Sequence, residues 1–235
     1  MIQLRPSAER GYADHGWLRA KHSFSFANYY DPAEMGWGAL RVINEDRVAP
    51  GQGFGTHGHR DMEIVTYILS GALEHKDSLG HGGVIRRGEV QRMSAGKGIM
   101  HSEFNPLPDE ETHLLQIWIE PAQRGTRASY EQQALPIEEM RGRWRLVASP
   151  DGAEGSTTIG QDARLWATVL VPGEFAEYGL AAGRLAYVQV VSGQLSINGQ
   201  ALAAGDGAKI ADETLLEFLA DEEAEILLFD LPPIA

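Results

Sequence analysis

The sequence predicts an all-β protein built from two antiparallel β-barrels or sandwiches in tandem. Short runs rich in β-branched and aromatic residues, such as 62–69 and 113–119, are separated by glycine-containing turns. No helical segments alternate with these runs, as they would in a parallel sheet. The second half of the chain also repeats the outline of the first half, which indicates two copies of one strand arrangement.

The internal repeat places the domain boundary near the middle of the chain. Residues 186–197 repeat the pattern of residues 65–75, including a Ser-Gly pair at the same place. We therefore predict an N-terminal barrel over 1–135 and a C-terminal barrel over 136–235. The polar stretch 121–150 is expected to join them as an arm with a helical turn.

Each expected strand is bounded by turn residues. Residues 62–69 end at a Ser-Gly pair, and 72–77 are expected to return beside them as a hairpin. An Ala-Pro-Gly-Gln-Gly turn follows the first long strand. In chain order, the other main strands are expected at 41–48, 88–93, 113–119, 186–191 and 225–231.

Composition limits the classes of function. The 235-residue chain carries a formal net charge of −13, which opposes binding to phosphate backbones, so we expect no direct nucleic-acid binding. No stretch approaches the ~20 apolar residues of a membrane helix, and we expect no signal peptide, because no apolar core follows a basic start. We expect a cytoplasmic monomer without membrane association. Because cysteine is absent, any metal must be held by nitrogen and oxygen atoms.

Two stretches carry the residue types of a metal site. One contains His57 and His59, with Glu63 four residues later, and the other contains His101 and Glu103. Side chains two apart on a β-strand share a face, so each stretch presents its donors together. Neutral imidazole suits iron, nickel, copper and zinc, and an added carboxylate favours iron. The sequence thus predicts a transition-metal site with open positions for other ligands.

Histidine is confined to the first half of the chain. All eight histidines lie at or before residue 113, so only the N-terminal barrel is expected to bind metal, with one ion per chain. The other histidines receive different roles. We expect His15 and His22 to be structural or on the surface, His75 to lie on a solvated strand end, His81 to lie in an exposed loop, and His113 to take a core or second-layer position.

Large aromatic residues are concentrated in residues 1–50. We expect them to pack in the core and at the barrel rim, with a wall near the mouth of a pocket as the alternative. They are Trp17, Phe24, Phe26, Tyr29, Tyr30 and Trp37.

The histidine stretches resemble the two motifs of the cupin superfamily. The pattern Gly51-x5-His-x-His-x3-Glu-x7-Gly71 is similar to the first motif, and Gly96-x-Gly-x2-His-x3-Asn105 to the second. Gly96 stands where many cupins have proline, and the gap before Gly71 is one residue longer. Both departures agree with the pirin family, which the segments 22–28, 41–44 and 93–103 also resemble. The match is closest to bacterial pirins that act as quercetin 2,3-dioxygenases.

This resemblance implies a fold, a cofactor and an activity. The fold would be two tandem cupin-type barrels, a bicupin, with a metal held by His57, His59, His101 and Glu103. The expected cofactor is one divalent transition metal, with iron first and nickel, copper, cobalt, manganese or zinc as alternatives. The implied activity is a dioxygenase that opens the heterocycle of quercetin-type flavonols with O2 and releases carbon monoxide. The substrates would then be a small aromatic flavonol and O2.

Two other functions stay open at this point. Eukaryotic pirins are described as iron-dependent partners of transcription factors, which implies a non-enzymatic metal-binding or redox-sensing module. A cupin enzyme acting on a different phenol is the third reading.

The two glutamates compete for the metal. Alternation along a strand allows both, because Glu63 would share a face with His57 and His59, and Glu103 with His101. The resemblance to pirins favours Glu103, which is also only ~7 Å along the strand from His101. We therefore predict Glu103 as ligand and catalytic base. Glu63 depends on a bend near Asp61 and is expected to orient a histidine from outside the metal's ligands.

Overall fold

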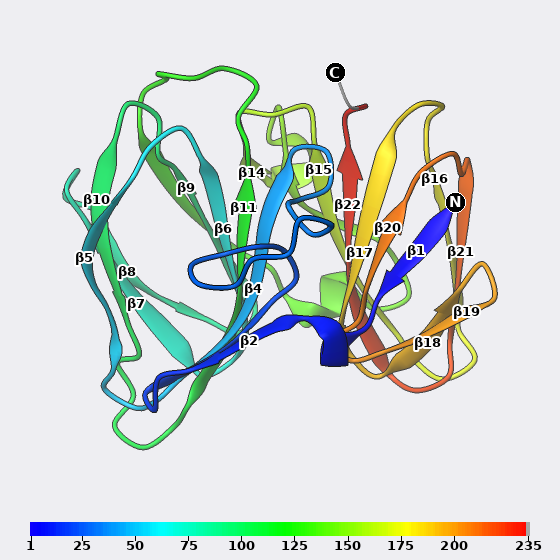
Figure 1. The fold of residues 1–235 in the computed structure, drawn as a ribbon, viewed down its shortest axis with the longest axis horizontal. Coiled ribbons are helices and arrows are strands. Elements are labelled where there is room, and N and C mark those ends of the chain that lie inside the picture. The colour runs from blue at the N-terminus through cyan, green and yellow to red at the C-terminus, as the bar shows by residue number, and fades with distance from the viewer. Residues whose placement is uncertain (234–235) are drawn as a thin grey trace.

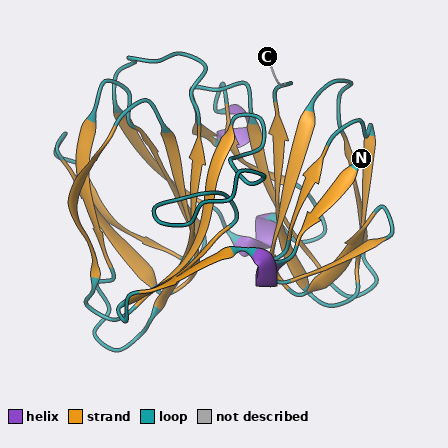
Figure 2. Ribbon diagram, in the orientation of Figure 1, coloured by secondary structure: helices purple, strands orange, loops and turns teal. Residues whose placement is uncertain are grey.

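The computed structural model describes residues 1–233, which form two β-barrels side by side (Figure 1). Strands make up both barrels, and the short 3-10 helices lie where the barrels meet (Figure 2). Each barrel consists of a seven-stranded sheet and a four-stranded sheet. The predicted all-β tandem architecture is therefore confirmed. Among the described residues, no helix has the length and apolar character needed to cross a membrane.

The N-terminal barrel contains the strands between residues 11 and 134. Its seven-stranded sheet has the spatial order β12 (Ser129–Ala134), β9 (Glu89–Ser94), β6 (Glu63–Ser70), β11 (Thr112–Ile119), β4 (Leu40–Val48), β3 (Leu18–His22) and β2 (Gly11–Asp14). Its four-stranded sheet has the order β5 (Gly53–His59), β10 (Ile99–Phe104), β7 (Ala72–Asp77) and β8 (Gly82–Arg86).

The C-terminal barrel repeats this arrangement. Its larger sheet has the order β1 (Ile2–Arg5), β20 (Gly207–Ile210), β17 (Leu185–Ser192), β22 (Ala224–Leu231), β15 (Arg164–Leu170), β13 (Arg145–Ser149) and β14 (Thr157–Thr158). Its smaller sheet has the order β16 (Phe175–Gly179), β21 (Leu215–Ala220), β18 (Gln194–Ile197) and β19 (Gln200–Ala203). The 3-10 helices are η1 (Ser7–Glu9), η2 (Ile137–Glu139) and η3 (Ala153–Gly155).

The first strand crosses the expected domain boundary. β1 pairs antiparallel with β20, so it belongs to the sheet of the C-terminal barrel, where Figure 1 shows it in blue beside the orange strands. β12, which lies within the predicted connecting arm, pairs with β9 and closes the N-terminal sheet. The division near residue 135 stays a prediction. It assigns β1 to the N-terminal domain, although this strand pairs within the C-terminal sheet.

The chain passes from one sheet to the other at two equivalent glycines. Gly71, between β6 and β7, has φ of 76°, and Gly193, between β17 and β18, has φ of 77°. A Cβ on Gly193 would lie 2.1 Å from the carbonyl oxygen of Glu223, so no side chain fits there. The expected hairpin over 62–77 is wrong, because β7 pairs with β8 and β10 instead of β6. The left-handed turn redirects the strand into the opposite sheet.

The interiors of the two barrels differ. Apolar side chains such as Leu195, Leu216 and Phe218 fill the C-terminal barrel. A second large apolar cluster joins the two seven-stranded sheets, with Ile117 from one and Phe229 from the other. The inner face of the N-terminal four-stranded sheet instead carries polar side chains, which leaves this barrel as the place for a polar site.

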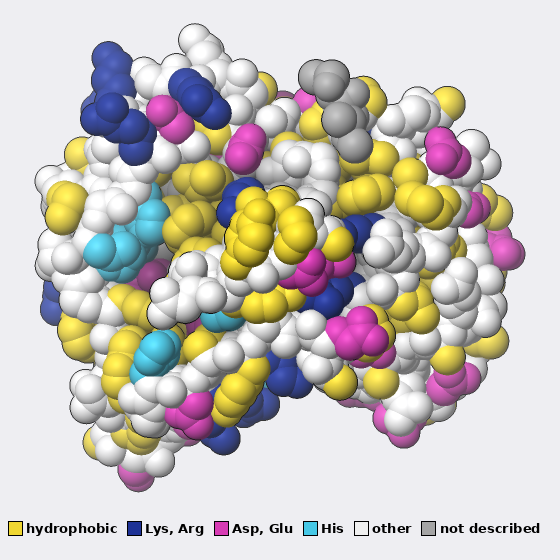
Figure 3. Space-filling model, in the orientation of Figure 1, with side chains coloured by type: hydrophobic (Ala, Val, Ile, Leu, Met, Phe, Trp, Pro, Cys, Tyr) yellow, Lys and Arg dark blue, Asp and Glu magenta, His cyan; other side chains and the backbone are white. Residues whose placement is uncertain are grey.

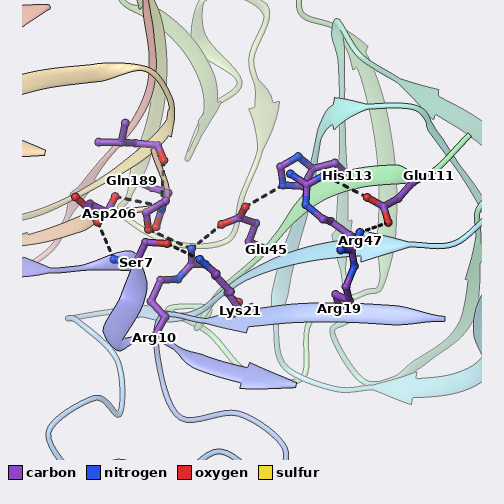
Figure 4. A network of polar contacts seen from close by, with 12 residues as sticks. Ser7, Arg10, Arg19, Lys21, Glu45, Arg47, Glu111, His113, Gln189 and Asp206 are labelled. Carbon is purple, nitrogen blue, oxygen red and sulfur yellow. Dashed lines mark hydrogen bonds and ion pairs between the residues drawn. The ribbon is translucent and has the colours of Figure 1, made fainter. Parts of the chain in front are cut away.

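A polar network also links the barrels, as Figure 4 shows. Arg10 donates to Glu45 Oε2 at 2.6 Å and to the carbonyl oxygen of Gly205 at 3.1 Å. His113 Nε2 lies 3.0 Å from Glu45 Oε1. His113 shares the face of Leu115 and Ile117, as expected, because β11 keeps an unbroken register with β4 from Thr112 to Trp118. It lies at the end of that face, half-buried, and bonds Glu45 in this network instead of joining the apolar core.

Candidate metal centre

The four-stranded sheet of the N-terminal barrel brings the predicted histidines together. β5 and β10 are antiparallel neighbours, with His57 opposite His101 and His59 opposite Ile99. The Nε2 atoms of His57 and His101 lie 3.0 Å apart. One ring nitrogen from each of His57, His59 and His101 falls within a group whose atoms are all within 4.8 Å of one another.

The surroundings of this cluster keep two of its three imidazoles unprotonated. Burial and the neighbouring His57 lower the pKa of His59 to about 4. Burial and the neighbouring histidines lower the pKa of His101 to about 3. At neutral pH these rings are uncharged and present nitrogen lone pairs, the form that binds metal ions. Three converging imidazoles without a charged partner fit a transition metal held by nitrogen.

Glu103 lies beside this cluster. A register shift between His101 and Glu103 places Glu103 opposite Phe54 of β5. Its carboxylate belongs to a second group of close donors, which contains His75 and His101 and not the other two histidines. His101 is thus common to both groups. Among the described residues, both groups lie in the N-terminal barrel.

The carboxylate of Glu103 is held by a short polar chain. Gln116 Nε2 donates to both of its oxygens at 3.1 Å, and Thr66 Oγ1 donates to Gln116 Oε1 at 3.1 Å. Burial raises the pKa of Glu103 to about 7. Sequence reasoning missed Gln116 because it comes from β11, in the opposite sheet. Gln116 alternates in phase with Leu114 and Trp118, which indicates the face of β11 on which it lies but not the residue that it contacts.

His75 was predicted to lie on a solvated strand end, and this prediction is wrong. Its side chain is fully buried, with Nε2 3.1 Å from Asp77 Oδ2 and Nδ1 3.4 Å from His101 Nδ1. The reason is its register, because β7 is the inner neighbour of β10 and Glu103 lies opposite His75. The spacing His75-x-Asp77, two apart on one strand face, was the signal in the sequence.

The Asp77 carboxylate connects His75 with a histidine at the surface. Its Oδ2 also lies 3.1 Å from Nδ1 of His81, whose side chain is 43% exposed. The expectation that His81 lies in an exposed loop is confirmed. The Tyr130 ring stacks on both imidazoles, with centroids 4.8 Å from His75 and 5.3 Å from His81.

Glu63 does not orient a histidine, in contrast to its expected role. Its carboxylate accepts a hydrogen bond of 2.5 Å from Ser94 Oγ and another from the backbone N–H of Gly160, in the second half of the chain. Burial raises its pKa. β5 ends at His59 and β6 begins at Glu63, with Asp61 at φ of 49° between them. The face shared by 57, 59 and 63 therefore does not exist, because no single strand contains all three.

A cavity of about 260 Å³ opens beside the histidine cluster. Figure 3 shows histidine side chains (cyan) on this face of the molecule, next to apolar side chains (yellow). The accessible surface of the cavity is mostly apolar, while seven of the twelve lining residues carry polar groups, a combination that small-molecule sites use to orient a ligand. It consists of Leu18, Ala20, His22, Phe26, Asn44, Asp46, Phe54, His57, His59, Glu103, Gln116 and Trp118.

Residues near the N-terminus shape the mouth of this cavity. A neighbouring hollow of about 550 Å³ shares Phe26 and Phe54 with it and continues toward Trp17 and Tyr29. Phe24 is buried in the core. Some of the aromatic residues therefore pack in the core and others form a wall near the mouth of the cavity. His15 is exposed, as expected.

His22 has a position that the sequence did not show. Its side chain is buried and lines the cavity, and its Nδ1 lies 2.8 Å from Asn44 Oδ1. The interpretation of His22 as merely structural or superficial is incomplete, because β3 turns this residue toward the cavity on the same face as Leu18 and Ala20.

Family comparisons cover both halves of the chain. The family model described as Pirin matches residues 3–119. The model described as the quercetinase C-terminal cupin domain matches residues 146–231.

Individual relatives match over the whole length. The chain is 50% identical to the quercetin 2,3-dioxygenase of Escherichia coli K12 over 234 residues, all of both chains. It is 46% identical to a putative quercetin 2,3-dioxygenase of Pseudomonas aeruginosa, over 98% of this chain and 100% of that one. The crystal structure of the bacterial pirin YhhW from Escherichia coli in complex with nickel(II) is 49% identical, with a TM-score of 0.96 over 100% of both chains.

Proposed function

Because this chain belongs to the pirin family, we propose that it is a metal-dependent dioxygenase that opens the heterocycle of quercetin-type flavonols with O2 and releases carbon monoxide. The observation that carries the proposal is the cluster of His57, His59 and His101 at the wall of an apolar cavity, with the buried Glu103 beside it. Full-length relatives named as quercetin 2,3-dioxygenases support the same substrate class.

The donor set fits one transition metal held by His57, His59, His101 and Glu103. The three imidazoles would provide nitrogen donors, and Glu103, which is grouped with His101 but not with His57 or His59, would provide an oxygen donor of opposite charge to the ion. When bound, such a metal supplies Lewis acidity and a redox-active centre for O2. The related bacterial pirin YhhW was crystallised in complex with nickel(II), so nickel stands beside iron as a candidate for this chain.

The protein's own groups prepare the substrate. Glu103 is placed to accept the proton of the flavonol 3-hydroxyl, because its buried carboxylate lines the cavity beside His57 and His59. Gln116 holds the carboxylate in place through its amide. Phe26 and Trp118, whose ring centroids are 5.4 Å apart, provide apolar surface for a flat ligand and exclude water.

A turnover assay tests this function. Metal-loaded protein is mixed with quercetin under air, and flavonol absorbance, O2 uptake and carbon monoxide release are followed. The expected result is equal consumption of quercetin and O2 with one carbon monoxide per turnover, none of it under nitrogen or after chelation. If the metal-loaded protein leaves quercetin intact, the proposed activity is contradicted and the non-enzymatic pirin-like module is favoured.

A further inference from the structure

Asp46 is a cavity residue that the proposed chemistry does not use. It lies on β4, where Asn44, Asp46 and Val48 are buried and the alternating Arg47 is exposed. Its side chain lines the same cavity as Glu103, His57 and His59. The strand position thus points a carboxyl group at any ligand that fills the cavity.

This carboxyl group has no partner in the protein. Its Oδ1 is buried without a hydrogen bond, and no ion pair reaches the residue within 1–233. The other buried acidic residues of the described chain each have a hydrogen bond or an ion pair; they are Glu34, Glu63, Glu103, Glu225 and Asp230. Buried polar groups are mostly paired, and among the buried acidic residues of the described chain Asp46 is the exception.

The neighbours of Asp46 explain why it stays unpaired. Ala20 lies opposite it on β3, and Leu18 and Val48 form an apolar cluster with Ala20. Burial and the nearby Glu103 raise its pKa to about 7, which reflects the cost of a charge in these surroundings. A fold that only needed stability would place an apolar side chain here, because an unsatisfied polar group is unfavourable. An unpaired buried carboxyl therefore needs an explanation, and a bound ligand is one.

We propose that Asp46 binds a second hydroxyl group of the substrate, apart from the hydroxyl assigned to Glu103. This inference rests on the proposed function and narrows its substrate class to aromatic compounds with at least two hydroxyl groups. A site built around a buried acceptor disfavours the analogue that lacks the matching hydroxyl, because the acceptor then stays unpaired. Asp46 is in this view a specificity-determining residue.

Two substitutions separate a binding role from a structural one. Asp46→Leu keeps the approximate size and removes both oxygens, while Asp46→Asn keeps one acceptor oxygen. Arg47→Gln is the matched control, since Arg47 is the next residue on β4 and is exposed on the other face. Metal content is measured for every variant, because Glu103 lies close to Asp46 in the cavity.

The experiment is an anaerobic titration of the metal-loaded proteins with flavonols. The probes are 3-hydroxyflavone, which has one hydroxyl, and galangin, kaempferol, fisetin and quercetin, which add hydroxyls at other ring positions. We expect the wild type to bind at least one of the latter about tenfold or more tightly than 3-hydroxyflavone, since a hydrogen bond to a buried acid contributes on that order. Asp46→Leu should abolish the difference, Asp46→Asn should keep part of it, and Arg47→Gln should keep all of it.

The melting temperature provides the second readout. Because Asp46→Leu removes an unpaired buried carboxyl, it should melt at a higher temperature than the wild type while discriminating less. A lower melting temperature with an equal loss for all flavonols would identify a structural role and overturn the inference. If the wild-type protein with full metal binds no flavonol at all, the proposed substrate class fails, and the inference fails with it. If it binds them and Asp46→Leu changes nothing, only the inference fails.

Discussion

His75 and His101 face each other through their Nδ1 atoms, which lie 3.4 Å apart. On its other side, His75 Nε2 is 3.1 Å from the Asp77 carboxylate, so the proton on Nε2 is the one that Asp77 accepts. Nδ1 of His75 is then an acceptor, with the Gln91 amide nitrogen and Nδ1 of His101 both 3.4 Å away as donors. This sequence of hydrogen bonds leaves Nε2 of His101 unprotonated toward His57, 3.0 Å away.

Replacing His75 should therefore weaken metal binding without removing a ligand. His75→Phe keeps the flat ring next to Tyr130 but cannot accept the proton of His101. We expect metal affinity to fall by about 10–100-fold, the usual effect of losing a group that orients a ligand. Competition with a chelator of known affinity measures it.

His81→Ala is the matched control for His75→Phe. His81 bonds the same Asp77 oxygen but is exposed and does not contact His101. Its loss should change metal affinity by less than about threefold. Equal losses from the two variants would show that Asp77 itself, and not the contact between His75 and His101, holds the metal centre.

The second prediction concerns the histidine cluster. His57→Ala, His59→Ala and His101→Ala should each lose metal and turnover, because each removes one of three converging nitrogens. Circular dichroism should stay that of the wild type, since apolar clusters outside the site hold the barrels together. Elemental analysis should give one metal ion per wild-type chain. The surface control His15→Ala should also bind one metal ion per chain. Two ions per chain, or a cluster variant with full metal, contradicts the assignment.

The fold was largely predictable because its signals are local. Branched and aromatic runs with glycine turns indicate strands, and the Ser-Gly pairs at Gly71 and Gly193 reveal the repeat. Strand partners were less predictable. β7 leaves the sheet of β6 at Gly71, and β1 joins the C-terminal sheet. Neither arrangement has a signal in the nearby sequence, because both depend on packing between distant strands.

The candidate site divides in the same way. The spacing in the sequence brought His57, His59 and His101 into one hypothesis, and the structure places their ring nitrogens together. His75, Gln116 and Asp46 were missed or misjudged, because each reaches the cavity through the register of a neighbouring strand. The charged residues next to His75 suggested exposure, but on a strand they belong to the opposite face.

The third prediction is a pH dependence of stability that comes from Glu45. Burial raises the pKa of this carboxyl, but the hydrogen bond from His113 and the charge of Arg10 lower it to about 2 overall. A carboxyl whose pKa lies below its value of 4.5 in the unfolded chain stabilises the fold above that pH and loses this effect as the pH falls toward 2. This contribution is about 3 kcal/mol at pH 7 and roughly 1 kcal/mol at pH 3.

Urea unfolding of the wild type and Glu45→Gln at several pH values measures this contribution. The difference in unfolding free energy should be largest above pH 5 and shrink steadily toward pH 3. Arg19→Gln serves as control, because its ion pair with Glu111 is at the surface and should contribute little at any pH. A difference that stays constant from pH 7 to pH 3 contradicts the assignment to Glu45.

The fourth prediction concerns the contact between the barrels. Glu225 of β22 is buried, pairs with Arg87 of the N-terminal barrel and accepts the hydroxyl hydrogen bond of Tyr67. Glu225→Leu leaves the guanidinium and the hydroxyl without their acceptor, so the unfolding free energy should fall by about 3–5 kcal/mol. The double variant Arg87→Leu, Glu225→Leu should recover part of this loss. A double variant no more stable than Glu225→Leu would show that shape, and not charge, determines the cost.

The last prediction separates the two glutamates that the sequence left in competition. Glu103 is buried beside His101 and held by Gln116, whereas Glu63 is bonded to Ser94 and to the backbone of Gly160. Glu103→Gln should lose nearly all turnover and bind metal more weakly, because an amide is a poor base and a weaker ligand. Its thermal stability should fall little or rise, since a buried carboxyl is removed.

Glu63→Gln should show the opposite pattern. A glutamine has one acceptor oxygen where two donors converge, so one hydrogen bond is lost and the unfolding free energy falls by about 1–3 kcal/mol. Metal affinity should stay near that of the wild type, because no contact joins Glu63 to the histidine cluster within the described chain. Metal titration and thermal unfolding are measured for both variants. If the assignment is right, Glu103→Gln loses metal affinity and Glu63→Gln loses stability. Loss of metal from Glu63→Gln, with affinity and rate unchanged in Glu103→Gln, reverses it.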